Sequence, residues 1–184
     1  MPLRPLLFAA AMLAGTAVNA APDPHSYANA NAVRVTDLAL DLKVDFTTSE
    51  LKGSAELSLD WKDPKASELV LDTRDLVIDK VHAIDAKGKS SAVKYHLDPR
   101  DPIYGSALHI KLASGTPKVR IDYHTVPAAS GLQWMTPAQT ADGKHAFMYS
   151  QSQAIHARSW VPLQDSPGVR FTYSAHIKAP TGYR

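Results

Sequence analysis

The chain contains no cysteine, which excludes any stabilisation by disulfide bonds and any lipid anchor attached to an amino-terminal cysteine. An excess of one charge is also lacking, because 20 Lys and Arg residues face 18 Asp and Glu residues. A chain this balanced offers no basic footprint for nucleic acid or for an anionic membrane. We therefore expect a domain of 184 residues that is stabilised by its own apolar core in any redox environment.

Long hydrophobic runs are absent except for one near the amino terminus. Residues 1–20 have the pattern of a signal peptide, with Arg4, the apolar run Leu6–Ala14 and a small-residue cleavage site ending at Ala20. The run is too short to span a bilayer, so we expect no membrane span after cleavage. A short hydrophobic helix retained in the mature protein is the alternative. Export predicts a periplasmic or secreted protein.

The small, polar segment 21–32 predicts a flexible leader, and residues 33–184 predict one folded domain. In the domain, apolar residues recur at every second position, first over Leu38–Phe46 and then over Ala55–Trp61. This period predicts two strands with one buried and one solvated face, joined by a turn at 47–50. The same period predicts later strands at Leu69–Leu71, Leu76–Ile84, Val93–Leu97, Leu108–Leu112, Val119–Tyr123 and Phe171–Ile177. An all-β fold follows, either an antiparallel β-sandwich or a large curved sheet.

The segment 149–168 carries the most informative polar pattern. Gln151 and Gln153 are two residues apart, so on a strand they would project from the same face. Two neutral amides side by side offer both donors and acceptors, which suits the ammonium and amide groups of a peptide. The alternative is that both side chains simply face water.

Together with Gly131-Leu-Gln-Trp-Met-Thr-Pro-Ala-Gln-Thr140, the run Ser150-Gln-Ser-Gln-Ala-Ile-His-Ala-Arg158 resembles the N-terminal domain of M1-family zinc aminopeptidases. The likeness is to the branch that includes leukotriene A4 hydrolase, and it continues through Pro162, Gln164, Asp165 and Pro167. It extends more loosely from about Val33 to the end. The resemblance implies a saddle-shaped assembly of sheets.

The resemblance also implies roles for three residues as a substrate-binding set. Gln153 matches the family position that contacts the free α-amino group of the substrate, where other branches carry Glu. Ala154 is small enough to let the backbone approach the ligand, and Gln151 would line the same entrance. The implied partner is a peptide with a free N-terminus.

The chemistry of the family is not encoded in this chain. The sequence contains neither the zinc-binding H-E-x-x-H motif nor the G-x-M-E-N segment, and its eight histidines assemble into no ligand set. We therefore expect no catalytic residue and no metal ligand here. The resemblance implies that zinc is bound in the complete enzyme by a catalytic domain that this chain lacks, so the chain alone should be inactive.

The remaining conspicuous side chains predict structural roles. Arg158 and Asp165 are each expected to be part of a buried or interfacial ion pair that fixes the loop, and His156 to orient the segment through a hydrogen bond. Four aromatic residues are expected to serve core or interdomain packing, namely Trp134, Phe147, Tyr149 and Trp160.

The last predicted strand lacks a following partner, so we expect the chain to be truncated at its C-terminus, with an open strand edge. Two functions outside the enzyme class remain open at this point. One is a stand-alone secreted β-sandwich binding module for peptide or carbohydrate. The other is an interaction domain that pairs its open strand with a partner.

Overall fold

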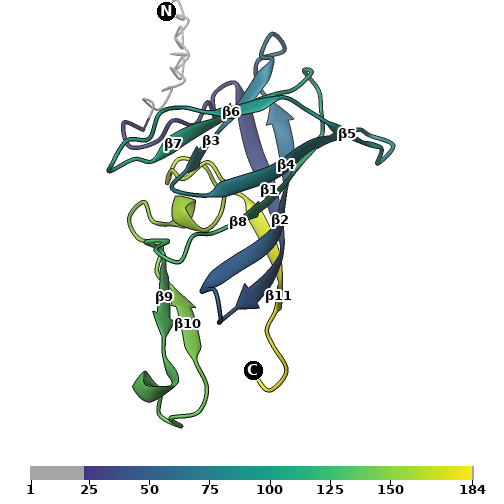
Figure 1. Cartoon of the computed structure of the whole chain (residues 1–184). Coiled ribbons are helices and arrows are strands. Elements are labelled where there is room, and N and C mark those ends of the chain that lie inside the picture. Colours follow the sequence, from purple (N-terminus) through teal and green to yellow (C-terminus); the bar gives the residue numbers. More distant parts are fainter. Residues whose placement is uncertain (1–22, 184) are drawn as a thin grey trace, which may run out of the picture.

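The computed structural model describes residues 23–183, so the predicted signal peptide lies outside the described part. Strands dominate it and helix is confined to two short 3-10 turns, as the alternating sequence predicts (Figure 1). The elements are β1 (Val33–Asp45), β2 (Glu50–Trp61), β3 (Glu68–Thr73), β4 (Val77–Ile84), β5 (Ser90–Ala92), β6 (Tyr95–Leu97), β7 (Ser106–Lys111), β8 (Lys118–His124), β9 (Leu132–Met135), η1 (Pro137–Gln139), β10 (Phe147–Ser150), η2 (Ala157–Ser159) and β11 (Thr172–Lys178).

Most of these strands form a six-stranded sheet in the order β11-β1-β2-β8-β4-β5. The predicted hairpin of β1 and β2 is confirmed, and the Asp45 carboxylate closes its turn by accepting hydrogen bonds from the amides of Thr47 and Thr48 at 2.8 and 3.2 Å. The pairing of β1 with β11 is parallel, unlike the other pairings of this sheet. Among the strands of residues 23–183, the last one therefore has β1 on one side and an open edge on the other.

A β-bulge in β1 explains why its buried positions change parity. Val33 and Val35 are buried, the register shifts between Val35 and Asp37, and from Leu38 to Val44 the even-numbered residues are buried instead. One extra residue in a strand reverses the facing of every later side chain. The bulge thus lets one long strand bury apolar residues along its whole length.

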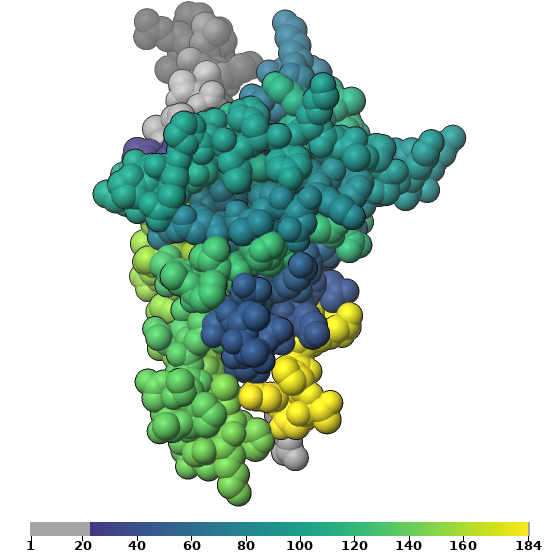
Figure 2. Space-filling view, viewed as in Figure 1, coloured from purple at the N-terminus to yellow at the C-terminus, as the bar shows by residue number. Residues whose placement is uncertain are grey.

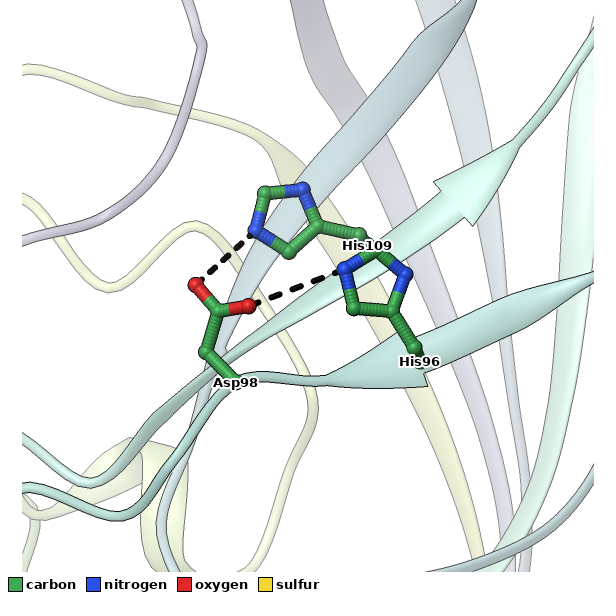
Figure 3. Close-up of side chains that lie close together, drawn as sticks. All are labelled: His96, Asp98 and His109. Carbon is green, nitrogen blue, oxygen red and sulfur yellow. Dashed lines mark hydrogen bonds and ion pairs between the residues drawn. The ribbon is translucent and has the colours of Figure 1, made fainter.

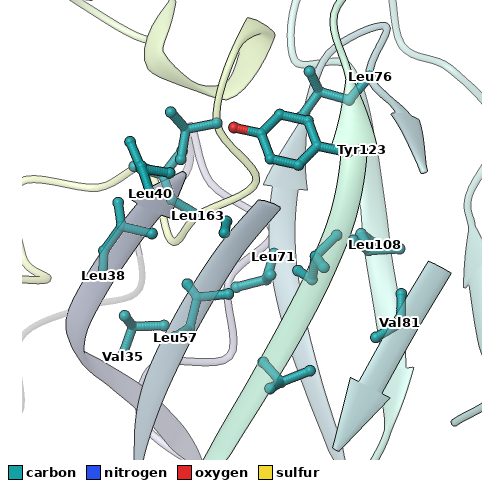
Figure 4. Packing of buried hydrophobic residues seen from close by; sticks show 14 of the residues in the cluster. Val35, Leu38, Leu40, Leu57, Leu71, Leu76, Val81, Leu108, Tyr123 and Leu163 are labelled. Carbon is teal, nitrogen blue, oxygen red and sulfur yellow. The ribbon is translucent and has the colours of Figure 1, made fainter. Parts of the chain in front are cut away.

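The core lies between this sheet and a smaller one in the order β3-β7-β6 (Figure 4). Leu69 and Leu71 of β3 and Leu108 of β7 are fully buried, and they belong to the same cluster as Leu57 and Tyr123 of the large sheet. Each such leucine stabilises the fold by roughly 1.5–3 kcal/mol relative to an exposed one. The two sheets therefore form one domain, and the all-β prediction is confirmed.

One predicted strand is confirmed only in part. The alternating residues 93–97 were expected to be continuous, but the chain leaves the large sheet after Ala92 and enters the small one at Tyr95. The crossing connects β5, paired with β4, to β6, paired with β7. Sequence alternation alone cannot reveal this change, because both short strands keep the same period.

The predicted leader makes specific contacts with the domain over its described part, residues 23–32. The Ser26 hydroxyl and the Tyr27 amide donate to the Asp72 carboxylate at 2.6 and 2.7 Å. The Asn29 carboxamide pairs with the edge of β3, donating to the Glu68 carbonyl and accepting from the Val70 amide, both at 2.9 Å. The polar composition serves these contacts, so the segment lies against the domain.

The hairpin of β9 and β10 forms a separate two-stranded sheet. It stands out from the body next to the C-terminal segment, as the space-filling view shows (Figure 2). Among the described residues, no helix is long and apolar enough to cross a membrane.

Candidate functional site

A polar hollow of about 510 Å³ lies where the β9–β10 hairpin joins the body. Both strands contribute to it at the base of the hairpin, together with the turn that follows β10. Its walls are Ser130, Gly131, Leu132, Gln133, Tyr149, Ser150, Gln151, Gln153 and His156. The hollow therefore gathers both glutamines that the sequence singles out.

The predicted strand through Gln151 and Gln153 is wrong, because β10 ends at Ser150. The Gln151 amide still donates to the Gly131 carbonyl at 2.9 Å, but its side-chain oxygen then accepts from the Gln153 amide at 3.2 Å. This side-chain bond turns the backbone away from the ladder, as short polar loops often do. The two glutamines line one hollow because of this turn rather than because of strand periodicity.

Ala154 is exposed and is not part of the wall of the hollow. The Gln153 side chain forms no hydrogen bond with any residue of the 23–183 segment. Its carboxamide is therefore available to a ligand, whereas that of Gln151 is partly engaged.

Gly131 permits the close approach that shapes the hollow. A Cβ at this position would lie 2.5 Å from the backbone oxygen of His156 and 2.9 Å from the Ser159 hydroxyl oxygen. The Gly131 amide donates to that hydroxyl at 2.7 Å, and the hydroxyl donates to the His156 carbonyl at the same distance. Only glycine lets the hairpin and η2 pack this tightly.

At the wall of the hollow, His156 is held by polar neighbours. Its Nδ1 lies 2.9 Å from the Ser130 hydroxyl and 3.3 Å from the Arg74 guanidinium. Arg74 also donates to the Ser130 hydroxyl at 3.1 Å and to the Ile103 carbonyl. Burial lowers the pKa of Arg74 below its ordinary value.

The structural ion-pair role predicted for Arg158 and for Asp165 is confirmed, and the structure pairs the two with each other. Arg158 is completely buried and its Nε donates to the Asp165 carboxylate at 2.9 Å. Its terminal nitrogens donate to the carbonyls of Tyr104 at 3.1 Å and of His25 at 2.8 Å. One side chain thus ties η2 to the leader and to the loop before β7.

The buried Asp72 completes this network from β3. It lies 3.7 Å from the Arg158 guanidinium and accepts from the Asp165 amide at 2.9 Å. Burial raises the pKa of Asp72, while the Ser26 hydroxyl and Arg158 act in the opposite direction. The network holds the segment after the hollow in a fixed place.

The predicted packing role of the aromatic residues holds for two of them. Trp134 and Trp160 pack against the core, and the Trp160 indole donates to the Ser152 hydroxyl at 3.0 Å. Phe147 and Tyr149, on β10, are instead 52% and 46% exposed. Their interdomain role stays a prediction.

The wall of the hollow carries no carboxylate, ammonium or guanidinium group, although Arg74 lies behind it. It presents carboxamides, hydroxyls and an imidazole. Such a surface can accept hydrogen bonds from a cationic amine without neutralising it.

Comparison with known proteins decides the family. A profile of the Peptidase M1 N-terminal domain matches residues 23–184. The chain belongs to this family. The match begins ten residues before Val33, in agreement with the docked leader of this M1 N-terminal domain.

Individual relatives support the leukotriene A4 hydrolase branch of this family. The chain is 39% identical over 170 residues to "Leucine aminopeptidase 2" of Neurospora crassa, a match that covers 88% of this chain and 25% of the relative. It is 34% identical to the "Leukotriene A-4 hydrolase homolog" of Botryotinia fuckeliana, covering 89% and 26%. The chain thus spans about a quarter of the length of these relatives.

Solved structures agree with the fold. Yeast LTA4 hydrolase in complex with bestatin superposes with a TM-score of 0.80 at 33% identity, covering 90% of this chain and 26% of that one. An M1 zinc metallopeptidase from Deinococcus radiodurans, at 18% identity and a TM-score of 0.59, shares the fold.

The residues of this M1 N-terminal domain do not fit the zinc centre implied by the family. The sequence lacks H-E-x-x-H, and no residue of the hollow belongs to the one cluster of three metal-ligating side chains found within residues 23–183. That cluster joins His96, Asp98 and His109, which the sequence had left unassembled.

The sequence also offers no indication of Ser130 and Arg74, which contact His156 in the wall of the hollow. They precede His156 by 26 and 82 residues in the chain. No local pattern signals such contacts. Gly131 alone carried a hint, because a glycine directly before a strand often marks a close backbone approach.

Proposed function

We propose that this chain is the N-terminal, substrate-recognition domain of an exported zinc aminopeptidase. Its relatives are named as aminopeptidases or as leukotriene A4 hydrolase homologues. Of these two activities, the one proposed for the complete protein is that of an aminopeptidase. The substrate is a peptide with a free N-terminus.

The observation that carries the proposal is the free carboxamide of Gln153 at the polar hollow. A carboxamide oxygen accepts a charge-assisted hydrogen bond from an ammonium, worth roughly 1.5–3 kcal/mol when water is excluded. An internal peptide bond has no ammonium to offer. The contact would therefore select chain ends, and Gln151 would support it from the same wall.

The reaction centre belongs, in this proposal, to polypeptide outside the chain. The relatives are about four times as long, and the sequence here lacks the zinc-binding motif. The zinc of the complete enzyme would polarise the scissile carbonyl and activate water. The catalytic domain that holds it is then the principal partner of this chain.

Export is proposed from residues 1–20 and places the mature protein in the periplasm or the medium. The amino-terminal sequence of protein recovered outside the cytoplasm should begin at Ala21. A protein that keeps Met1 and stays in the cytoplasm would contradict this part.

Kinetics of the complete enzyme test the recognition step. Gln153→Ala should raise KM for peptides with a free amino group by about tenfold or more, while leaving folding intact, because one charge-assisted bond is lost. Gln153→Glu should lower KM, because a full negative charge faces the ammonium.

Gln139→Ala is the matched control, since Gln139 is an exposed glutamine outside the hollow. It should leave KM unchanged. Equal kinetics for wild type, Gln153→Ala and Gln153→Glu would remove Gln153 from recognition. Peptide hydrolysis by the purified 184-residue chain alone would refute the division of labour.

A further inference from the structure

Strands β6 and β7 bring together three side chains that the proposed function does not use. His96 on β6 lies directly opposite His109 on β7 in the antiparallel ladder. Asp98 is two residues after His96, and its amide continues the ladder by donating to the Ala107 carbonyl at 3.0 Å. All three side chains therefore stand on the same face of the small sheet (Figure 3).

In this cluster, one ring nitrogen of each histidine lies near the carboxylate of Asp98. The His109 Nε2 lies 3.2 Å from one Asp98 oxygen, and the His96 Nε2 lies 3.6 Å from the other. The imidazole rings are stacked, with centroids 4.7 Å apart and planes inclined by 5°. A donor atom from each residue lies within 4.8 Å of the donor atoms of the other two.

His109 is also held from behind, which is typical of a metal-binding histidine. Its Nδ1 lies 3.6 Å from the Glu68 carboxylate of β3, so its two ring nitrogens face two different carboxylates. A carboxylate on the far nitrogen fixes the orientation and tautomer of a ligating imidazole. The neighbours Leu108 and Ile110 are fully buried, so the backbone under His109 is rigid.

We propose that His96, Asp98 and His109 bind a divalent first-row transition metal ion such as Zn²⁺. Two imidazoles and one carboxylate suit zinc, copper or nickel, whereas magnesium and calcium prefer oxygen ligands alone. Because an imidazole nitrogen binds a metal in the plane of its ring, the two stacked rings must tilt toward each other before both can form bonds of about 2.0–2.1 Å to one ion. Water would complete the coordination.

Exposure distinguishes this site from a buried structural centre. The side chains of His96 and Asp98 are 58% and 47% exposed, and that of His109 is 21% exposed. Metal can therefore enter from solvent without unfolding the protein. Because β6 has only three residues, all of them exposed, the bound ion would fasten this short strand and the following turn to β7.

Titration of the chain with Zn²⁺ tests the proposal, with calorimetry for stoichiometry and nuclear magnetic resonance for the histidine ring signals. We expect one ion per chain, with the rings of His96 and His109 shifting most and Mg²⁺ shifting neither. At a hundredfold excess over Kd, zinc should raise Tm by roughly 5–10 °C.

Variants localise the binding. His96→Asn should weaken it by at least about tenfold, and Glu68→Gln by roughly 10–100-fold through the orientation of His109. His145→Asn is the matched control, because His145 also pairs with an aspartate, Asp142 at 2.6 Å, but has no third ligand within the described part of the chain.

Circular dichroism of each variant verifies that the fold is kept. Zinc binding that survives His96→Asn, or that shifts His145 as much as His96 and His109, would overturn the proposal. So would the lack of any zinc-dependent shift at these two rings.

Discussion

At the scale of single residues, the hollow depends on a glycine as much as on its glutamines. Gly131 allows two backbone segments to approach so closely that a methyl group would overlap the His156 carbonyl. The two glutamines are held at the rim by this approach, because the Gln151 amide bonds to the Gly131 carbonyl.

Gly131→Ala should therefore destabilise the domain by about 1–3 kcal/mol, because backbone atoms must move to admit the methyl group. Chemical denaturation of the chain measures this. Gly168→Ala is the control, since its added Cβ would meet only the Ser166 hydroxyl at 3.6 Å, and it should change stability by less than about 0.5 kcal/mol. Equal stabilities for both variants would contradict the role given to Gly131.

Arg158 is the residue on which most of the surrounding loops depend. Replacing it by Met keeps much of its volume but leaves Asp72 and Asp165 without their cation in a buried site. Breaking a buried ion pair in this way costs about 3–5 kcal/mol.

The free energy of unfolding of Arg158→Met should fall by that amount, a large part of the stability of a typical domain. Arg100→Met removes the exposed pair with Asp75 and serves as the comparison, because solvent screens that pair. An Arg158→Met chain as stable as Arg100→Met would show that the network contributes nothing.

At the scale of elements, β8 connects the core to the segment beside the hollow. Tyr123 is fully buried, and its hydroxyl donates to the Trp160 carbonyl at 2.9 Å. Burial raises the pKa of Tyr123 well above its ordinary value of 10.0.

Above pH 10, the folded state consequently keeps the phenolic proton of Tyr123, which the unfolded state releases. Stability from this group is complete below pH 10 and is lost as the pH rises further. Ultraviolet titration should show Tyr123 ionising only as the chain unfolds, and Tyr123→Phe should remove that part of the alkaline destabilisation. Ionisation of Tyr123 in the intact fold would contradict the expectation.

The length of a strand decides whether the alternating pattern of the sequence can predict it. The long strands β1, β2 and β8 were predictable, because each alternates over six or more residues against one core. The hairpin of β9 and β10 was not, because four-residue strands carry too little periodicity. Gln151 and Gln153 were rightly placed together but for the wrong reason, since a side-chain bond to the backbone replaced the strand.

At the scale of the whole molecule, two sheets around one core present a hairpin that projects beside the C-terminal strand (Figure 1). Every side chain of β11 is exposed, and Tyr173 is 75% exposed. The domain spans about a quarter of the length of its relatives. In our proposal, the exposed face of β11 and the hollow therefore face the rest of the enzyme.

In the function proposed above, Gln153 recognises the ammonium of a peptide terminus. The most direct measurement compares, in the complete protein, the affinities for one peptide with a free and with an acetylated amino group. Gln153→Ala should reduce the preference for the free amine by roughly 10- to 150-fold, equivalent to about 1.5–3 kcal/mol. An unchanged preference in Gln153→Ala would contradict it.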